Sequence, residues 1–560
     1  MSAVDALDPG IFVLAIEEEA IVNRATFLAA ALVLFNPGGP AHAQTIPSAH
    51  QTVYNIMDYG AHNDGSGNAE EAFRAAIAAV KKAGGGTVFI PAGHYTSGPI
   101  EMVSNMTLYF DAGAIVNFPA VVLPFTKGRQ QGIETLTPVP LIGGHDLENV
   151  AVEGRGVLMS NNQDWMKLHG RTRSSGDNDP GSANGEHWEN LLNSLEAGKA
   201  VPESEYEKVA AELRPSFVRF MNSKNIMVDG LRFIGSPMWT VHILYSENAI
   251  VQNLVIETYP GVHTDGIVID SSRFVKLSND YIDTGDDGIV IKSGKDADGL
   301  RVNRPTEDVA ITNCTVHHAH GAVTIGSETS GSIRNITASN MTVKDTVNGA
   351  RIKSRRGRGG VVEDIRFDNW TMENVGEAIV VTNYYLMEGE RHTSEQPVSN
   401  KTPVFRNIAM SNMTINGAKV LIDIDGLPEM PIQELRLSNI IANGTVGLKA
   451  NYTDSLELHN VQVNPKTGPA FNINNAVNLE LDHVSSRKPV GGVPVIRLEN
   501  SPGAILRDSR AFPGTGTFLS VPVGELKQVV LQGNLLKSAK TPSEESGTAA
   551  KRPVQQGSEH

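Results

Sequence analysis

Cysteine is almost missing from this sequence, which has only Cys314 among its 560 residues. An intrachain disulfide framework and a cysteine-rich metal site are therefore both excluded. Positively charged residues are also outnumbered: the chain has 47 Lys and Arg against 62 Asp and Glu, which gives a net charge of -15. A general nucleic-acid binder is not expected, because phosphate would be repelled. Apolar residues make up 40% of the chain, enough for a large core, and this excludes wholesale disorder.

The chain's candidate export segment is too short to span a bilayer, which takes about 20 apolar residues. It covers residues 25–35 (ATFLAAALVLF), and Ala41-His42-Ala43 then offers a small-x-small cleavage pattern. We expect residues 1–43 to be a signal-like segment cleaved after Ala43, giving a secreted or periplasmic protein without stable membrane insertion. A buried apolar helix is the alternative for this run. The acidic stretch within residues 1–23 is atypical of a signal peptide.

Helical periodicity is strong in one place near the start of the chain, residues 68–83. Asn68 is placed to cap this helix, and Phe73, Ile77 and Val80 share one face. The glycines at 84–86 end it. Beyond this point helical periodicity largely vanishes, and β-rich runs take over.

The β-rich runs recur along the chain with an Asn or Asp beside most of them. Their starts are separated by 24, 25, 34, 27, 29, 43, 27, 21 and 23 residues; they are Asn225, Ala249, Phe274, Asp308, Asn335, Asp364, Asn407, Glu434, Ser455 and Asn478. The short steps indicate a rung of about 20–30 residues, and the long ones a rung plus an inserted loop. This predicts an all-β parallel β-solenoid, whose open end the N-terminal helix would cap. A β-sandwich with coincidental spacing is the alternative.

Two neighbouring rungs are nearly identical in sequence. Residues 264–271 read TDGIVIDS and residues 286–293 read DDGIVIKS, an offset of 22 residues. Asp265 should therefore stack on Asp287 across one strand spacing of about 4.8 Å. Alternation then assigns inward and outward positions. Ile267, Ile269, Ile289 and Ile291 are expected to point inward, and Asp270 and Lys292 outward.

The expected domain organisation is a single β-helix catalytic domain over residues 50–536. Residues 160–215 are long and polar, with a helix-like stretch from Glu186 to Leu213 that includes Trp188, and we interpret them as a loop insertion or lid. Residues 537–560 lack apolar periodicity and are expected to be a disordered tail.

Carboxylates gather on the two similar rungs, at Asp265, Asp286 and Asp287, with Gly285 and Gly288 flanking the pair. The glycines would allow a kink that turns both carboxylates of the pair into one cleft. Three acids this close cannot all ionise freely, so at least one pKa should rise. A raised acid beside ionised carboxylates suits glycoside hydrolysis. A turn-stabilising acidic cluster and a divalent-cation site are the alternatives.

Cationic and aromatic residues follow on the next rungs. His320 opens the run HGAVTIGS, and Arg351 and Lys353 should project outward in register with Val290 and Lys292. In so acidic a protein, these cations indicate a pocket for an anionic substrate, and Arg can bind a uronic-acid carboxylate with two hydrogen bonds. Tyr384 and Tyr385, one rung further on, are candidates to pack against a sugar face.

Taken together, these motifs resemble the family 28 glycoside hydrolases, the polygalacturonase family. The family's four signatures read here His263-Thr264-Asp265, Gly285-Asp286-Asp287, Ala319-His320-Gly321 and Arg351-Ile352-Lys353. The resemblance covers about residues 52–485. It implies a right-handed parallel β-helix and inverting hydrolysis of galacturonan-type pectin, without metal or other cofactor.

The resemblance also implies a role for each matching residue. Asp286 would be the general acid, and Asp265 and Asp287 would position the water. His320 would support the acid, and the site's substrate-binding residues are expected to be Arg351, Lys353, Lys292, Tyr384 and Tyr385.

Two positions depart from the family pattern: His263 replaces the usual Asn, and Ala319 replaces a Gly. We expect both to lie where they could reshape a subsite, so homogalacturonan, rhamnogalacturonan and xylogalacturonan stay open as substrates. A polysaccharide lyase and a non-catalytic carbohydrate-binding solenoid are the alternative functions. The expected partner is a polyanionic pectic glycan, and the expected state is a monomer.

Overall fold

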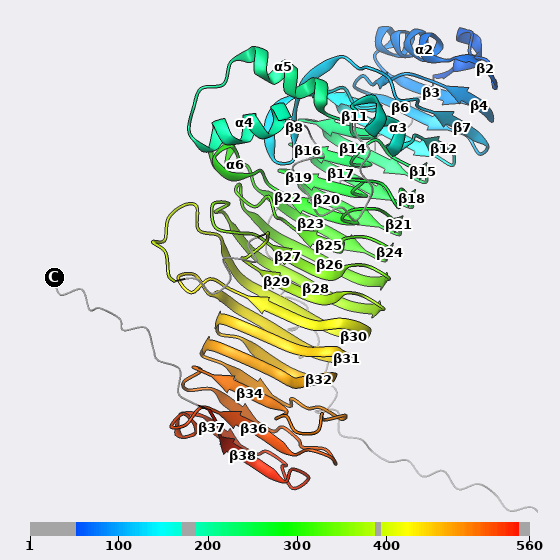
Figure 1. Cartoon of the computed structure of the whole chain (residues 1–560). Coiled ribbons are helices and arrows are strands. Elements are labelled where there is room, and N and C mark those ends of the chain that lie inside the picture. The colour runs from blue at the N-terminus through cyan, green and yellow to red at the C-terminus, as the bar shows by residue number, and fades with distance from the viewer. Residues whose placement is uncertain (1–51, 171–185, 387–393, 548–560) are drawn as a thin grey trace, which may run out of the picture. The chain divides into compact units, whose positions relative to one another are not determined.

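The computed structural model describes residues 52–170, 186–386 and 394–547, which form a right-handed parallel β-helix (Figure 1). A typical turn has three strands, as in β14 (Lys224–Asp229), β15 (Arg232–Ile234) and β16 (Val241–Leu244). Each pairs in parallel with its counterpart one turn later: β17 (Glu247–Gln252), β18 (Val255–Glu257) and β19 (Ile267–Asp270). The predicted all-β solenoid is confirmed.

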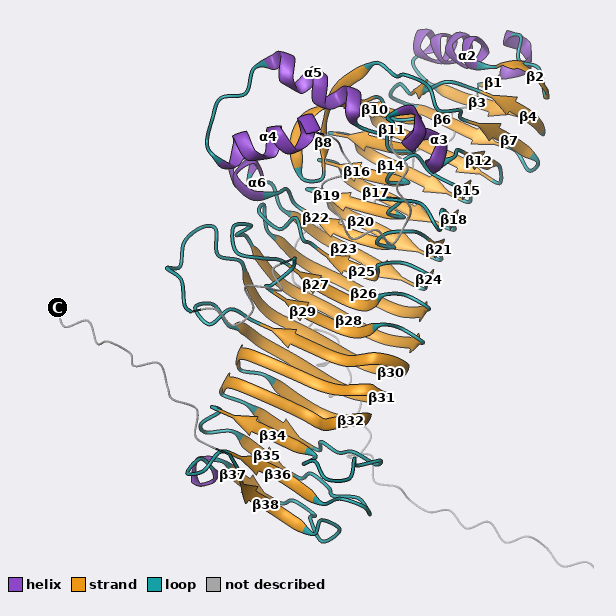
Figure 2. Cartoon of the chain, in the orientation of Figure 1, coloured by secondary structure: helices purple, strands orange, loops and turns teal. Residues whose placement is uncertain are grey.

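Strands β26 and β28 bend around a corner and serve two ladders each, and the long strands β30, β31 and β32 serve all three (Figure 2). All the remaining strands of the coil extend these three ladders. They are β1 (Val53–Asn55), β2 (Asp64–Asn68), β3 (Gly86–Ile90), β4 (Gly93–Thr96), β5 (Ile100–Glu101), β6 (Met106–Phe110), β7 (Ala114–Asn117), β10 (Ile142–His145), β11 (Glu148–Gly154), β12 (Val157–Met159), β13 (Val218–Met221), β20 (Arg273–Ser278), β21 (Tyr281–Asp283), β22 (Ile289–Lys292), β23 (Thr306–Thr312), β24 (Thr315–His317), β25 (Gly321–Ile325), β26 (Ile333–Lys344), β27 (Asn348–Lys353), β28 (Val361–Glu373), β29 (Glu377–Thr382), β30 (Val404–Asp425), β31 (Ile432–Asp454), β32 (Glu457–Val477), β33 (Glu480–Asp482), β34 (Ile496–Glu499), β35 (Ile505–Arg507), β36 (Thr517–Val521), β37 (Val530–Gln532) and β38 (Thr541–Glu545).

Other elements lie outside these ladders. They are the helices η1 (Ile56–Tyr59), α2 (Glu70–Ala83), α3 (Asn162–Leu168), α4 (Glu186–Glu196), α5 (Glu203–Glu212), α6 (Asp296–Val302) and η4 (Leu526–Gln528), and the antiparallel hairpin of β8 (Phe125–Gln130) and β9 (Ile133–Pro138).

The spacing of the turns follows the repeat read from the sequence. Ile336 pairs with Ile365 and Ile365 with Ile408, which are the expected steps of 29 and 43 residues. The long step of 34 residues contains helix α6. One of the predicted starts of the β-rich runs, Ala249, is wrong by one residue. The equivalent position is Asn248, because it takes the left-handed conformation (φ 58°) that the other starts share.

The core of the coil is filled by inward-pointing aliphatic side chains. Ile267 pairs with Ile289 and Ile269 with Ile291, and all four side chains are fully buried, as predicted. A turn cannot bury this face alone, so stacking on the neighbouring turns supplies most of its stability. The same register places Asp265 next to Asp287 on adjacent turns, because each lies two residues before a paired isoleucine.

Helix α2 covers the N-terminal end of the coil, as expected (Figure 1). Its buried face includes Phe73, Ile77 and Val80. The helix starts later than predicted, at Glu70, because Asn68 still belongs to strand β2. The Asn68 side chain nevertheless accepts a hydrogen bond from the Glu70 amide at 2.9 Å.

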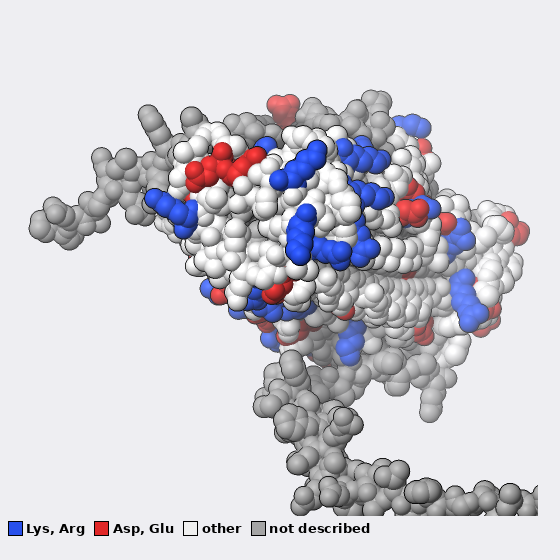
Figure 3. Space-filling model, turned by 90° about the horizontal axis from the view of Figure 1, so that it is seen from below, with Lys and Arg blue, Asp and Glu red and all other residues white. Residues whose placement is uncertain are grey.

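The coil extends further toward the C-terminus than the predicted boundary at residue 536. Strand β38 lies inside the segment expected to be a disordered tail and pairs in parallel with β36. This edge strand carries Pro542, Glu544 and Glu545, and Figure 3 shows Lys and Arg side chains gathered on this end of the coil. Proline and charge protect an open edge from pairing with another chain, and such a strand therefore lacks the apolar pattern that would reveal it.

The expected insertion at 160–215 is helical where it is described. Helices α4 and α5 pack together, and Trp188, Leu191, Val209 and Leu213 enclose Ile133 of β9 in a small separate core. The expected signal segment, residues 1–43, lies outside the described residues. Within the described ranges, no helix is long and apolar enough to cross a membrane.

Candidate active site

The three predicted carboxylates meet at one edge of a single parallel ladder, formed by β16, β19, β22, β25, β27 and β29 and called here the site sheet. Asp265 lies just before β19, and Asp286 and Asp287 lie just before β22. The Gly266 amide donates a hydrogen bond to the Asp287 carbonyl at 3.0 Å, which fixes the two turns against each other. Carboxylate oxygens of the three residues lie within 4.8 Å of one another. The predicted convergence is confirmed.

Close approach of the backbone explains the glycines around this cluster. A Cβ on Gly285 would lie 2.0 Å from the Gly261 carbonyl oxygen. A Cβ on Gly321 would lie 2.2 Å from Thr324 Oγ1 and 2.9 Å from Asp287 Oδ1. These glycines leave the space in which adjacent turns and the Asp287 carboxylate come together.

Each carboxylate has a different cationic neighbour. Asp286 Oδ1 lies 3.3 Å from His320 Nδ1, and Asp265 Oδ2 lies 3.7 Å from Lys292 Nζ. Asp287 accepts hydrogen bonds from Lys353 Nζ at 2.9 Å and from Thr324 Oγ1 at 2.9 Å. Asp286 is the most accessible of the three, with 19% of its side chain exposed against 4% for Asp265 and 3% for Asp287.

These neighbours separate the three pKa values. Burial raises the pKa of Asp265 well above its usual range, and the Asp286 charge adds to the effect. Burial also opposes ionisation of Asp286 and Asp287, but His320 holds the pKa of Asp286 low and Lys353 that of Asp287. The hydrogen bond to Asp286 in turn raises the pKa of His320. Asp265 thus favours its protonated form, as predicted for at least one acid of the cluster, while Asp286 and Asp287 favour the ionised form.

Lys292 points away from the core, as predicted, but it does not reach solvent. Its side chain is only 7% exposed, and its Nζ lies 3.2 Å from Glu328 Oε1 and over the Trp239 ring. Lys292 therefore holds Asp265 and Glu328 in place. Its predicted contact with substrate stays a prediction.

Replacing Lys292 by methionine should strongly destabilise the protein. Glu328 would be left as a buried charge without its closest cation, and breaking a buried ion pair in this way costs about 3–5 kcal/mol. The raised pKa of Asp265 reduces its share of this cost. Urea unfolding measures the change, and adding Glu328→Gln to Lys292→Met should restore much of the lost stability. A single Lys292→Met variant as stable as the wild type would contradict this interpretation.

Arg351 and Lys353 lie side by side on strand β27, in the register that the sequence predicted. Val290 pairs with Thr324 and Thr324 with Arg351, so one outward row crosses three turns. Arg351 Nη1 lies 3.8 Å from Asp287 Oδ1, and its buried Nε–H has no hydrogen-bond partner among the described residues. A partly exposed guanidinium beside a second cation suits an acidic ligand.

The two neighbouring tyrosines have different positions. The half-buried Tyr385 ring lies against this pair, with Lys353 Nζ 4.8 Å and the Arg351 guanidinium 5.4 Å from its centroid. Tyr384 is only 1% exposed and packs under Arg356 instead, so its burial does not support the expected contact with a sugar.

Several residues that complete the site were missed by sequence reasoning. Thr324 bonds Asp287, and Asn348 Nδ2 donates to the His320 carbonyl at 2.7 Å. Both occupy the site sheet, so extending the register of Val290 and Arg351 through the run HGAVTIGS would have found Thr324. Glu328 lies in a loop after β25, and no sequence signal places it next to Lys292.

The β8–β9 hairpin covers part of the site sheet. Arg129 donates to Asp270 Oδ1 at 2.8 Å, and both side chains are fully buried. Asp270 thus points away from the core, as predicted, yet does not reach solvent. Gly132 at the hairpin tip has so little room that an added Cβ would lie 2.6 Å from Lys295 Cβ and 2.8 Å from Glu328 Cγ. The hairpin therefore abuts the loop that carries the Lys292 partner.

The two departures from the family pattern lie in different surroundings. Ala319 is fully buried in the core of the coil, so the expectation that it reshapes a subsite is not supported. His263 is half-buried, its charge lowers the pKa of Asp286, and its Nδ1 lies 3.5 Å from Arg214 Nη2. Of the two substitutions, His263 is the one in electrostatic reach of the catalytic cluster.

An acid that carries a proton, two ionised carboxylates and an adjacent cationic pair together suit hydrolysis of a glycosidic bond in an acidic sugar. The fold and this edge of the site sheet define a carbohydrate-cleaving enzyme on a β-helix. Lys292, Lys353 and Arg351 already neutralise the cluster, which disfavours the alternative of a divalent-cation site.

Comparison with known proteins supports the same class of enzyme. The profile of Glycosyl hydrolases family 28 matches residues 198–461, and that of Rhamnogalacturonase A/epimerase, pectate lyase-like, matches residues 53–121. The crystal structure of a hyperthermoactive exopolygalacturonase from Thermotoga maritima is 32% identical, with a TM-score of 0.66 over 74% of this chain and 93% of that one. The chain belongs to glycosyl hydrolase family 28 and is a glycoside hydrolase.

Curated relatives in bacteria are more distant. An exo-poly-alpha-D-galacturonosidase of Dickeya chrysanthemi is 25% identical over 68% of this chain and 65% of that protein. An endo-polygalacturonase of Pectobacterium carotovorum subsp. carotovorum is 24% identical over 75% of this chain and 91% of that protein. Relatives with both modes of cleavage are therefore similar to this chain.

Proposed function

We propose that the protein hydrolyses α-galacturonosidic bonds in pectin-type polysaccharide. The observation that carries this proposal is the pair of Arg351 and Lys353 beside the three carboxylates, with 17% of the Arg351 side chain exposed. A galacturonate carboxylate matches this pair in charge and in hydrogen-bonding geometry. Tyr385 lies against both cations and offers a ring face to the same sugar.

We assign the acid role to Asp286, because it is the most accessible carboxylate of the cluster. Asp265 and Asp287, on stacked turns, would hold and activate the attacking water. The raised pKa of Asp265 favours a proton there, within 4.8 Å of Asp286. His320 holds the pKa of Asp286 low in the free enzyme, so substrate would have to displace this contact before Asp286 takes the proton, becomes the acid and leaves Asp265 as a base.

The spacing of the carboxylates bears on the stereochemistry. Inverting enzymes with two carboxylates usually keep them about 6.5–9.5 Å apart to leave room for water. Here the oxygens lie within 4.8 Å. We propose inversion nonetheless, because the third carboxylate allows two of the acids to hold the water while the other protonates the leaving oxygen.

We further propose that the enzyme acts from a chain end. Val268 and Val290 point outward from the site sheet, yet both are fully buried, in a cluster with Met238 and Trp239. Gln130 of the hairpin contacts Met238, with its Nε2 2.7 Å from Sδ. The sheet is therefore covered on the N-terminal side of the Arg351 position. The hairpin supplies this cover and helices α4 and α5 support it, which refines the expectation that the 160–215 insertion itself is the lid.

Digestion of a long galacturonan tests the mode of cleavage. We expect early release of monomers or dimers with little loss of viscosity, because the covered sheet admits only a chain end. Disordering the hairpin by Arg129→Ala, which removes its buried anchor to Asp270, should increase the share of internal cleavage. A rapid fall in viscosity with mixed oligomers from the wild-type enzyme would rule out the exo-acting proposal.

Action on a polymer of this size also suggests work outside the cytoplasm. This supports the proposal that the protein is secreted or periplasmic. Cleavage after Ala43 and a monomeric state stay predictions.

A further inference from the structure

A repeated pair of residues occupies the same register position in successive turns of the coil. A small polar residue, usually Ser or Thr, is followed by an Asn in the left-handed conformation. Strand register stacks these pairs in two columns; they are Ser278-Asn279, Thr312-Asn313, Ser339-Asn340, Asp368-Asn369, Ser411-Asn412 and Ser438-Asn439. The asparagines bond one another along the coil, as Asn313 does to Asn279 at 3.4 Å.

The pattern changes in the next two turns. His459 replaces the small polar residue before Asn460, and Asp482-His483 then replaces both positions. The asparagine column thus stops at Asn460, which still bonds Asn439 at 2.9 Å. Neither substitution is needed for stacking, because Ser and Asn serve the earlier turns.

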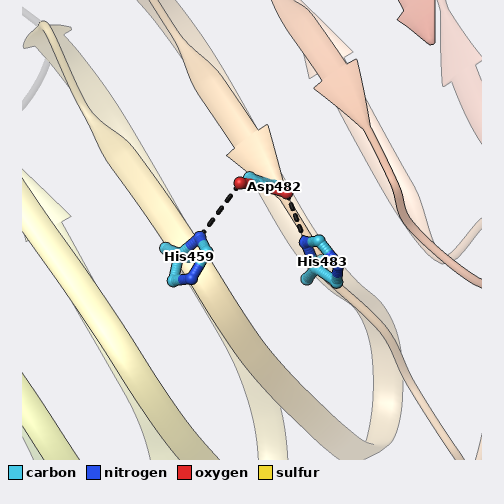
Figure 4. Close-up of side chains that lie close together, drawn as sticks. All are labelled: His459, Asp482 and His483. Atoms are coloured by element: carbon cyan, nitrogen blue, oxygen red, sulfur yellow. Dashed lines mark hydrogen bonds and ion pairs between the residues drawn. The ribbon is translucent and has the colours of Figure 1, made fainter. Parts of the chain in front are cut away.

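The substituted side chains meet at one point on the surface. Asp482 lies between the two imidazoles (Figure 4), with His459 Nδ1 3.0 Å from Oδ2 and His483 Nδ1 2.5 Å from Oδ1. His459 and Asp482 are register partners on β32 and β33. His483 follows Asp482 directly but points the same way, because its φ of 53° breaks the strand's alternation.

We propose that His459, Asp482 and His483 bind one divalent transition-metal ion of the Zn²⁺ type, outside the catalytic site. One ligand atom from each residue lies within 4.8 Å of the others. Zinc binds imidazole nitrogen and carboxylate oxygen at about 2.0–2.2 Å, so neighbouring ligand atoms lie about 3 Å apart. Both imidazoles are more than half exposed, at 54% and 56%, and are free to make the small shift this requires.

The charges around the cluster permit a cation. Arg507 Nη2 lies 3.3 Å from Asp482 Oδ2 and also pairs with Glu480, so two carboxylates share one guanidinium. The remaining negative charge is available to the metal. A groove of about 590 Å³ beside the cluster, lined in part by His459, Asp482 and Arg507, leaves room for water at the open coordination positions. A bound ion would link two adjacent turns of the coil through its ligands.

Zinc titration of the full chain without an affinity tag tests the proposal. We expect one Zn²⁺ bound per chain by the wild type, and at least tenfold weaker binding after His483→Asn or His459→Ser. These changes restore the residue types of the earlier turns, so both variants should fold. His187→Asn is the matched control, because it removes an imidazole paired with a single carboxylate, Glu205, and should leave the site intact.

A second readout is the visible spectrum with Co²⁺ in place of Zn²⁺, which reports nitrogen and oxygen ligation directly. The wild type and His187→Asn should give the same absorption bands, and His483→Asn should lose them. Unchanged zinc affinity in folded His483→Asn and His459→Ser, or no zinc binding by the wild type, would overturn the proposal.

Discussion

Asp286→Asn is expected to lower kcat on galacturonan by about 10²–10⁴-fold, the usual contribution of a general acid. The amide has the shape of the carboxyl group but cannot give up a proton. The Asp286 side chain is partly exposed and its partner His320 is more exposed still, so the fold should not change. Initial rates and a melting curve measured on the same preparation separate the two effects.

Asp283→Asn is the matched control for this experiment. Asp283 lies three residues earlier, on β21, and bonds His318 at 2.9 Å, so it reproduces the aspartate–histidine pairing outside the cluster. Its replacement should leave kcat near the wild-type value. Near wild-type turnover by a folded Asp286→Asn enzyme would contradict the assigned acid. Asp265→Asn should also lower kcat strongly, because the attacking water would lose its general base.

Arg351→Ala should weaken binding of oligogalacturonate by about 10- to 150-fold. A charged hydrogen bond of this kind contributes about 1.5–3 kcal/mol, and the Arg351 Nε–H has no competing partner among the described residues. Calorimetry in the Asp286→Asn background measures the affinity without turnover. The affinity for a neutral galactose oligomer, which lacks the carboxylate, should fall much less.

The control for this prediction is Arg74→Ala, which removes a largely exposed arginine on helix α2. It should leave both affinities unchanged. Equal losses for the acidic and the neutral oligomer after Arg351→Ala would show that Arg351 shapes the site without recognising the carboxylate.

The stacked core of the protein is readable from sequence, because each turn repeats the same positions. The register of Ile267 on Ile289 therefore located Asp265 beside Asp287, and the same logic aligned Arg351 with Val290. Stacking relates one turn to the next, and local repetition is enough to reveal it.

Contacts made by insertions are not readable in this way. The partner of Asp270 is Arg129, 141 residues earlier on a hairpin outside the repeat. Lys292 was expected to face the substrate because its position on the coil is outward, and Tyr384 because it lies one rung beyond Arg351 and Lys353. Loops that cover the coil bury them, and only tertiary structure shows which outward positions remain open.

Hydrolysis with inversion by three clustered carboxylates can be followed by proton NMR during the first turnovers on a galacturonate oligomer, before the product mutarotates. Inverting cleavage of an α-linked substrate must first release the β-anomer, and we expect that signal. A first product in the α-configuration would contradict the proposed roles of Asp265 and Asp287, and an unsaturated product absorbing in the near ultraviolet would show a lyase instead.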